Sequence, residues 1–479
     1  MDIFGPEAMM HRRFAVIGGG LAGLEAAVRI VSHPGMEVEV VEAGPSIRRH
    51  HVNWDTSAHP GDEKIRRWSS DGWGFGAGLS ERLGGRSLCY HGVLLGLTPE
   101  ELDDWHPCWQ ERLAGPRGLY AQVHGELGPE FPEPWESSLS AAATRIGIRH
   151  TPQAARYDDR TGRFEAYSPL PEARRLATMS DRFHIVRGRA LSLRRTKRGW
   201  AVDIETATGT LSTRQGFDAC VLASSAIGNV QILARTMGEP IITRITDHFC
   251  VGLLARIEPG NSLGTFRHPM LWTGYRPVPS LSTNVFVLER PPLPNGDRLI
   301  SLMAVIEQGS GPADFSTLMA QPSSTGDMAA THITTAVSPA DLDRIGRVRH
   351  ELLRQANEIC QGSLLDITAS HSTGNSLVGE FGGEDARRFG DGNAFRALLA
   401  HSQAGRAAQF ELPYGSYEHE ACSHPVGGDG ALRVTEDLEV EGLPGVYLAG
   451  PGNFVRLGAA NPALTIIAMS RWLGDSLAA

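Results

Sequence analysis

The feature that most constrains this chain is a glycine-rich turn between a short apolar strand and a helix. The pattern Gly18-x-Gly20-x-x-Gly23 directly follows the mostly apolar run 13–17 and precedes helix-forming residues 24–31. Such a run is typical of a strand buried on both faces of a parallel sheet. The first glycine permits a tight turn, the second lets backbone approach a pyrophosphate, and the third lets the helix pack on the strand. The segment predicts a dinucleotide-binding βαβ unit rather than an ordinary turn.

A carboxylate supports the same interpretation. A second strand is predicted over 37–41 and ends at Glu42. This residue stands roughly 20 positions after Gly23, where the ribose-binding acid of such a unit is expected. A carboxylate there suits an unphosphorylated ribose, because it would repel a ribose phosphate.

Bulk composition narrows the class of protein. At 479 residues the chain is too long for one core and predicts at least two joined domains. The net charge of −9, with both signs interspersed, argues against a nucleic-acid partner. The six cysteines lack zinc-site spacing, so we predict no metal and reduced thiols of a cytoplasmic protein. No apolar run is long enough for a bilayer, so no membrane partner is expected.

Later segments predict an antiparallel part. Alternating strands are expected over 251–258, 284–289 and 299–307, followed by an amphipathic helix over 338–361. This mixture suits a sheet with a covering helix that forms the wall of a substrate cavity. Further strands are expected between residues 183 and 223, whereas residues 129–180 look irregular and Pro-punctuated.

Three C-terminal motifs extend the pattern. They are His424-Pro-x-Gly-Gly, a buried strand ending at Gly450, and Asn461-Pro-x-x-Thr. With Gly18–Gly23, Gly84-Gly85-x-Ser87 and Asp247-His248, they resemble the glucose-methanol-choline (GMC) flavin oxidoreductases. The resemblance implies an α/β fold, with a Rossmann-type FAD-binding domain and an α+β substrate domain built on an antiparallel sheet. We predict residues 1–95, 181–249 and 425–479 for the first domain and 96–180 and 250–424 for the second.

The resemblance also implies which residues contact FAD. These are Gly18, Gly20, Leu21, Ala22, Gly23, Glu42, Gly84, Gly85, Ser87, Tyr90, Ala190, Gly450, Asn461 and Pro462. Some family members link the flavin covalently through a histidine whose position best matches Cys89. A buried thiol and a cysteinyl link are the two alternatives at that position.

His424 and Asn461 are the predicted catalytic pair. In the family, the position of His424 takes the hydroxyl proton and that of Asn461 hydrogen-bonds the same oxygen. The chemistry agrees, since a neutral imidazole can remove the proton as hydride leaves the carbon, and a carboxamide can hold the oxygen without adding charge. Alternatively, His424 is a packed residue in a turn, and Asn461 only caps the last helix with Pro462 at its first position.

Neighbouring residues receive other roles. His419 and Tyr417 are interpreted as surface or supporting residues, and His248 as structural. The predicted reaction is oxidation of a CH–OH group of a small to medium polar molecule, such as a sugar, cyclitol or biosynthetic intermediate, with oxygen or another electron acceptor. Two alternatives are a lyase or C–C desaturase on the same scaffold, and a non-catalytic flavin-binding partner.

Overall fold

A five-stranded parallel sheet carries the glycine-rich turn in the computed structural model. Its order is β21 (Val446–Leu448), β12 (Ala219–Leu222), β1 (Arg12–Ile17), β2 (Met36–Glu42) and β8 (Phe183–Arg187). The strands from the two chain ends therefore share one sheet. The structure describes residues 11–46, 51, 64–65, 68–71, 79–131, 139–158, 160–257, 262–264, 271–289, 296–309, 311, 314–322, 330–360, 407–412, 414–415 and 417–479.

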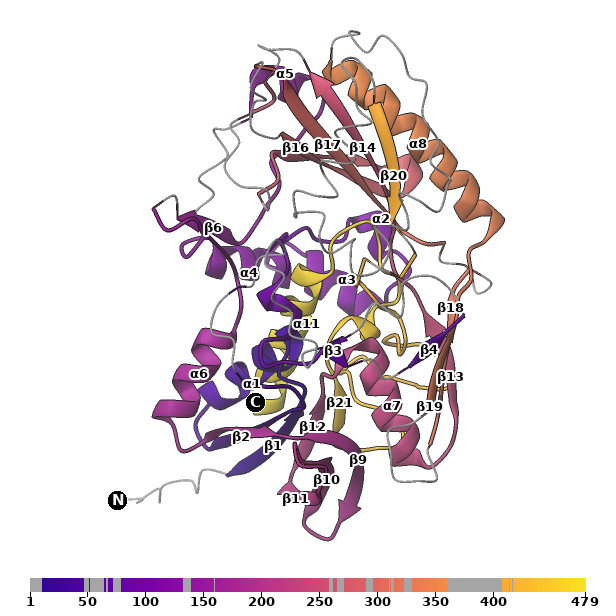
Figure 1. The fold of residues 1–479 in the computed structure, drawn as a ribbon. Coiled ribbons are helices and arrows are strands. Elements are labelled where there is room, and N and C mark those ends of the chain that lie inside the picture. The colour runs from indigo at the N-terminus through magenta and orange to yellow at the C-terminus, as the bar shows by residue number, and fades with distance from the viewer. Residues whose placement is uncertain are drawn as a thin grey trace.

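Helices from both chain ends pack together beside this sheet (Figure 1). Helix α1 (Leu21–Ser32) packs against α11 (Ala463–Ala478), and α6 (Leu170–Met179) and α4 (Leu119–Leu127) add to this layer. Arg12 donates a 2.8 Å hydrogen bond to the carbonyl of Leu477, which joins the first strand to the last helix. Helix α7 (Ser225–Met237) follows β12 and packs against β9 (Arg189–Thr196) and β18 (Ser316–Gln321).

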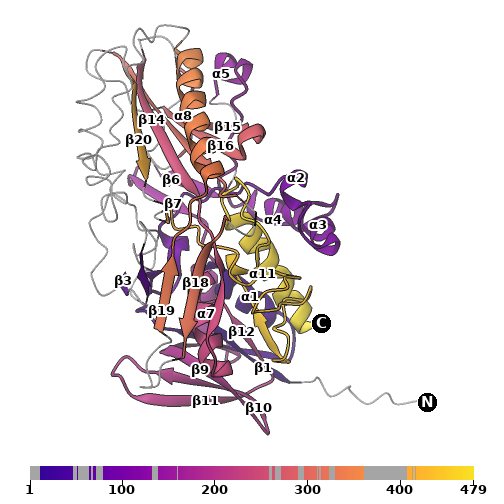
Figure 2. The same ribbon diagram turned by 90° about the vertical axis from the view of Figure 1, so that its right-hand side faces the viewer.

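A second five-stranded sheet lies at the other end of the molecule and is antiparallel (Figure 2). Its order is β15 (Gly274–Val278), β16 (Thr283–Glu289), β17 (Arg298–Ile306), β14 (Phe249–Ile257) and β20 (Ala407–Leu412). The long helix α8 (Pro339–Ile359) covers one face through a buried stripe that includes Ile345, Val348 and Leu352. This arrangement matches the predicted sheet with a covering helix.

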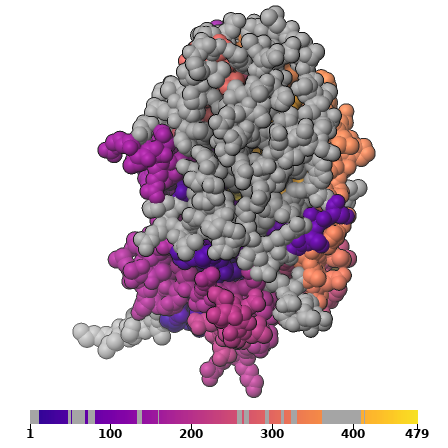
Figure 3. All heavy atoms as spheres, viewed as in Figure 1, coloured from indigo at the N-terminus to yellow at the C-terminus, as the bar shows by residue number. Residues whose placement is uncertain are grey.

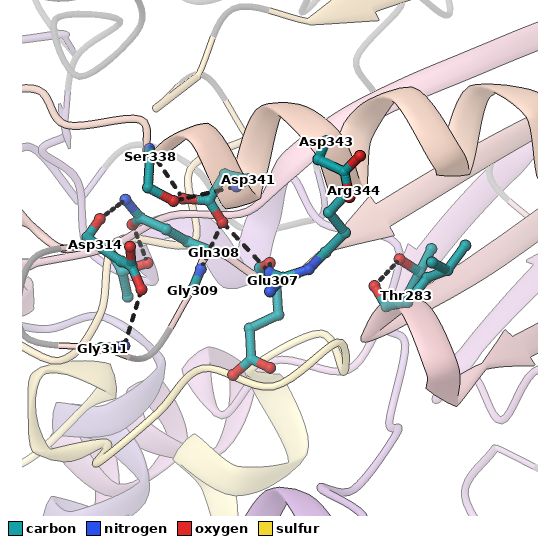
Figure 4. A network of polar contacts seen from close by, with 12 residues as sticks. Thr283, Glu307, Gln308, Gly309, Gly311, Asp314, Ser338, Asp341, Asp343 and Arg344 are labelled. Atoms are coloured by element: carbon teal, nitrogen blue, oxygen red, sulfur yellow. Dashed lines mark hydrogen bonds and ion pairs between the residues drawn. The ribbon is translucent and has the colours of Figure 1, made fainter.

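The start of α8 is fixed by buried polar groups (Figure 4). Ser338 and Asp341 form a capping box, in which the Ser338 hydroxyl accepts from the Asp341 N–H and donates to its carboxylate. Asp341 also accepts from the N–H of Gly309 at 2.8 Å. Arg344 donates to the carbonyl of Glu307 at 2.7 Å, so α8 is tied to the end of β17. The Glu307 carboxylate points away from α8 toward the C-terminal segment.

Smaller elements complete the fold. Strands β9, β10 and β11 form an antiparallel sheet that projects at the lower end of the space-filling view (Figure 3). Their bounds, with those of the remaining elements, are β9 (Arg189–Thr196), β10 (Gly199–Glu205), β11 (Leu211–Phe217), β13 (Ile241–Ile245), β18 (Ser316–Gln321), β19 (Ala330–Thr334), β4 (Ser69–Ser70), β3 (Lys64–Ile65), β5 (Leu79–Ser80), β6 (Ala155–Asp158), β7 (Arg163–Ala166), α2 (Pro99–Leu102), α3 (Pro107–Ala114), α5 (Ala141–Arg145), η2 (Gly85–Leu88), η4 (Pro279–Leu281) and η6 (Pro451–Asn453). No described helix combines the length and the apolar character needed to span a bilayer.

Two local expectations differ from the structure. Residues 129–180 are not uniformly irregular, because they contain α5, the β6–β7 hairpin and α6. Pro171 lies in the first turn of α6, where proline is tolerated, so it does not interrupt the helix. Asn461 is not the cap of the last helix, since α11 begins at Ala463 and Pro462 occupies the cap position without a side-chain hydrogen bond.

Candidate active site

The glycine-rich turn has two kinds of glycine. Gly18 has φ +108°, and a Cβ there would lie 2.4 Å from the carbonyl oxygen of Ala223. A Cβ on Gly23 would lie 1.9 Å from the carbonyl oxygen of Gly18. A Cβ on Gly20, the N-cap residue of α1, would meet no described atom within 4 Å, and glycine has no side chain to cap the helix. Gly18 and Gly23 are therefore required by packing, whereas Gly20 leaves open space beside unpaired N–H groups.

Two further glycine segments meet this helix end. The N–H of Gly84 donates to the carbonyl of Gly19 at 2.7 Å. A Cβ on Gly85 would lie 3.0 Å from the Cα of Gly20, so these two backbones approach closely. Gly450 has φ +104°, and its Cβ would lie 3.7 Å from that of Ala22. Three segments far apart in sequence thus form one glycine-lined cradle at the start of α1.

Glu42 lies at the edge of this cradle. Its two carboxylate oxygens accept 2.7 Å hydrogen bonds from the N–H groups of Gly19 and Gly44. Burial raises the pKa of Glu42, and these two hydrogen bonds oppose that effect. The N–H of Gly188 donates to the Glu42 carbonyl at 2.8 Å, which brings the start of β9, with the buried Ala190, to the same edge.

The other predicted cofactor residues have defined positions. Leu21 and Ala22 form the first turn of α1. The Ser87 hydroxyl donates to the Gly84 carbonyl at 2.6 Å and lies 2.7 Å from the Ser168 hydroxyl, so it braces the second glycine segment from inside. The Tyr90 hydroxyl donates to the Tyr167 carbonyl at 2.8 Å.

His424 is fully buried and both ring nitrogens have partners. Nδ1 lies 2.8 Å from Oδ1 of Asn453, and Nε2 lies 3.3 Å from Nδ2 of Asn229. Asn453 uses its own Nδ2 to donate to the Leu448 carbonyl, so its Oδ1 accepts from His424 Nδ1. Burial lowers the pKa of His424 to about 4. The ring is a neutral imidazole whose Nε2 lone pair faces the Asn229 amide.

Asn461 contacts a different group. Its side chain hydrogen-bonds to the hydroxyl of Tyr417, which lowers the pKa of that phenol, although burial raises it well above the usual value. The Oδ1 atom of Asn461 is buried and has no hydrogen-bond partner among the described residues. Between the described side chains of His424 and Asn461 no hydrogen bond is formed. The structure therefore places the two predicted catalytic residues in separate polar clusters.

A histidine pair lies next to Tyr417. Nδ1 of His419 is 2.8 Å from Nδ1 of His248, and Nε2 of His248 is 2.7 Å from the carbonyl oxygen of Gly458. The Tyr417 ring packs edge-on against both imidazoles, with centroids 4.6 Å from His419 and 6.0 Å from His248. Tyr417 thus links the histidine pair to Asn461. This pairing could not be predicted from the sequence, because the two histidines are 171 positions apart.

Asp247 holds this cluster through the backbone. Its fully buried carboxylate accepts from the N–H groups of His248 at 2.7 Å, His419 at 3.0 Å and Glu418 at 3.2 Å. Burial raises the pKa of Asp247 well above its usual value, and Glu420 adds to the shift. Glu418 has φ +65°, which is rare outside glycine and is often found at functional sites. The position of His419 is therefore set by buried polar contacts.

The loop before Asn461 is held by carboxylates. Oε1 of Glu307 accepts from the N–H of Gly458 at 2.8 Å, while the same carboxylate pairs with Arg456. Glu101 accepts from the N–H of Ala459 at 2.6 Å. In Figure 4 the Glu307 side chain points away from α8, toward the C-terminal segment. Glu307, directly after β17, and Glu101 of α2 thereby fix the loop that carries the Gly458 carbonyl and leads to Asn461.

Two further groups can be located in the described part of the chain, possible metal ligands and the thiol of Cys89. There, no group of three or more His, Cys, Asp or Glu side chains is arranged to hold a metal ion. The Cys89 thiol is buried and lies 3.5 Å from the carbonyl of Arg86 and from the Arg82 guanidinium. The alternative of a cysteinyl link at Cys89 stays open.

The chain is similar to known proteins in its fold. No family model matches the chain, and no curated protein matches its sequence. Pyridoxine 4-oxidase from Mesorbium loti aligns over 97% of this chain and 99% of its own, with a TM-score of 0.60 and 16% identity. A fungal aryl-alcohol oxidase aligns over 96% and 98%, with a TM-score of 0.61 and 12% identity. The chain has the fold of the GMC flavin oxidoreductases.

A third structure has the same GMC fold. It is an FAD-dependent oxidoreductase from Chaetomium thermophilum, which aligns over 97% of this chain and 98% of its own, with a TM-score of 0.58 and 15% identity. The likeness covers nearly the full length of each protein. The predicted combination of a Rossmann-type sheet and an antiparallel substrate-domain sheet is confirmed at the level of fold.

Proposed function

We propose that the protein is an FAD-dependent oxidoreductase that converts a CH–OH group of a small to medium molecule to a carbonyl. One observation carries the proposal. Three glycine segments and Glu42 converge on the uncapped N-terminus of α1, where the structure leaves open space beside Gly20. The names of the three solved structures, two oxidases and an FAD-dependent oxidoreductase, agree with it.

The cradle fits the phosphates and ribose of FAD. Unpaired N–H groups at a helix N-terminus attract a pyrophosphate, and a backbone without Cβ atoms permits its close approach. Glu42 retains acceptor capacity, because each carboxylate oxygen receives one backbone hydrogen bond and has a second lone pair. Gly20, Gly85 and Gly450 would therefore contact the pyrophosphate region, and Glu42 the ribose.

Side chains of the protein would orient the substrate hydroxyl and accept its proton. FAD, when bound, supplies the hydride acceptor. A histidine takes the hydroxyl proton, which avoids a protonated carbonyl product. Asn461 Oδ1 lacks a partner in the part of the chain that the structure describes and would orient a substrate hydroxyl. A carboxamide can do this without adding charge to the site.

Two histidines are candidates for the base. His424 was predicted from sequence, but it is fully buried and both ring nitrogens face asparagine side chains. His419 is partly exposed, and among the described residues its ring hydrogen-bonds through Nδ1. His419 also shares Tyr417 as a neighbour with Asn461. These contacts support His419 as the base and His424 as a packing residue.

The substrate is proposed from the groups near this cluster. Trp272, Tyr275 and Tyr417 are partly buried aromatic residues that pack against the core containing the α1 and α11 side chains. His91 packs on Trp272 with ring centroids 5.4 Å apart. Such surroundings combine flat apolar surfaces with polar tips, which suits a hydroxylated molecule of modest size. Oxygen or another acceptor would complete the cycle.

Anaerobic spectroscopy tests the proposal. The purified protein is expected to carry oxidised flavin, whose absorbance is lost when an alcohol from a panel of sugars, cyclitols and aromatic alcohols is added without air. A lyase would convert its substrate without an electron acceptor and leave the flavin oxidised. A colourless protein that takes up no added FAD contradicts the proposal outright.

A further inference from the structure

The His248–His419 pair has a hydrogen-bond pattern that determines where its protons lie. His248 ends the connection between β13 and β14, and His419 lies on the segment before His424. A carbonyl oxygen only accepts, so the 2.7 Å contact with Gly458 requires a proton on Nε2 of His248. A neutral His248 then has a bare Nδ1, which faces Nδ1 of His419 at 2.8 Å. His419 must therefore carry its proton on Nδ1 and leave Nε2 bare.

Both rings are neutral in this arrangement. Burial lowers the pKa of His248 to about 4. Burial also lowers the pKa of His419 well below its usual value, and the charges of His248, Arg86 and His91 act in the same direction. The carboxylates nearby do not reverse this, because Glu418 and Glu420 pair with Arg86 and Asp247 accepts backbone N–H groups.

We infer that His248 is a positioning residue that fixes the Nδ1–H tautomer of His419, so that Nε2 of His419 presents a lone pair to the substrate hydroxyl. In the proton-transfer step the substrate O–H bond breaks and its proton goes to this Nε2. The resulting imidazolium keeps its Nδ1–H directed at the lone pair of His248. The inference rests on the proposed function, in which His419 is the base.

Hydrogen bonds to the surrounding protein hold both histidines in these tautomers. The Gly458 carbonyl cannot move freely, because the Gly458 N–H is held by Glu307. The backbones of both histidines are held by the same Asp247 oxygen, Oδ1. Neither imidazole ring can therefore rotate by a half turn without breaking buried hydrogen bonds. A histidine without such a partner would divide between its two tautomers, and only a fraction would have a basic Nε2.

Nitrogen NMR of the flavin-loaded protein tests the tautomer directly, without turnover. The chain has 18 histidines, so the ring ¹⁵N signals of His419 and His248 are assigned by comparing the wild type with His419→Gln and His248→Asn. The expected spectrum near pH 7 shows His419 protonated at Nδ1 and bare at Nε2, and His248 the reverse. A His419 protonated at Nε2, or a mixture of tautomers, overturns the inference. The proposed function is judged separately, by flavin bleaching.

Matched variants test the consequence for catalysis. The side-chain oxygen of asparagine can replace Nδ1 of histidine as the acceptor, whereas leucine removes it. His248→Leu is expected to give mixed His419 tautomers and to lower kcat by about tenfold or more, within the ~10²–10⁴-fold range of general base catalysis. His248→Asn should retain the tautomer and most of kcat, and His350→Leu on the exposed face of α8 serves as control. Equal kcat losses in both His248 variants, with the Nδ1–H tautomer unchanged, would leave His248 a merely structural role and refute the inference.

Discussion

At the scale of single residues, two histidines five positions apart have different surroundings. His424 is enclosed by Asn229, Asn453 and Gly452, and a Cβ on Gly452 would lie 2.1 Å from its Nε2. His419 is only partly buried and contacts His248 through Nδ1, which we infer leaves Nε2 with a lone pair. Chemistry at a hydroxyl needs an accessible lone pair, so we assign proton transfer to His419 and packing to His424.

Alanine variants separate these two roles. His419→Ala is expected to lower the rate of anaerobic flavin reduction by at least about 10²-fold, because the general base is lost, with the fold intact. His424→Ala should instead lower the free energy of unfolding by about 2–4 kcal/mol, because it opens a cavity and removes the hydrogen bonds that the ring makes to the buried side chains of Asn453 and Asn229. Stopped-flow absorbance and denaturant unfolding measure the two effects. A stable His424→Ala protein that cannot reduce its flavin would contradict this assignment and identify His424 as the base.

The pH dependence of stability reports on the same residue. In the folded protein, burial lowers the pKa of His424 to about 4 from its ordinary 6.5. Between these two pH values His424 is therefore protonated in the unfolded chain but neutral in the folded protein. The contribution of the neutral His424 ring to the free energy of unfolding is fully present above pH 6.5 and is lost as the pH falls toward 4. Denaturation midpoints should fall over this window. His424→Gln should reduce the steepness of that fall, and an unchanged pH dependence in the variant would argue against a buried neutral ring.

At the scale of elements, the turn before α1 offers a paired substitution. Gly20→Ala places its Cβ in open space and should fold normally, yet it should lower flavin content because the methyl group occupies the proposed pyrophosphate position. Gly23→Ala places a Cβ 1.9 Å from a backbone oxygen and should destabilise the fold itself. Gly125→Ala, also in open space but on α4, serves as control. Full flavin occupancy in Gly20→Ala would contradict the placement of the cofactor.

Local patterns predicted most elements but not all. The strand–turn–helix at residues 13–31 and the helix after Ser338 were predictable, because glycine placement and an amphipathic pattern are local signals. The helix α6 was missed, because Pro169 and Pro171 suggested a loop although proline is compatible with the first turn. The capping role of Asn461 was wrong, since its side chain turns to Tyr417 instead.

At the scale of the whole molecule, the candidate site depends on contacts that sequence order does not show. The cradle was predictable, because each of its glycine segments has a recognisable motif. The histidine pair was not, because it forms only when the β13–β14 connection meets residues 417–419 and the carbonyl of Gly458. Buried carboxylates from different parts of the chain, Asp247, Glu307 and Glu101, then fix these segments. The motif containing His424 predicted a base in this segment, and we propose the neighbouring imidazole of His419 for that role.

The most direct test of the account is a single anaerobic turnover with a substrate and its deuterated form. Flavin-loaded protein is mixed with an alcohol that it oxidises, carrying hydrogen or deuterium on the hydroxyl-bearing carbon, while flavin absorbance and carbonyl product are followed. We predict one carbonyl formed for each flavin bleached, with bleaching slowed several-fold by deuterium because the C–H bond breaks in that step. Product formed while the flavin stays oxidised would contradict hydroxyl oxidation by this protein.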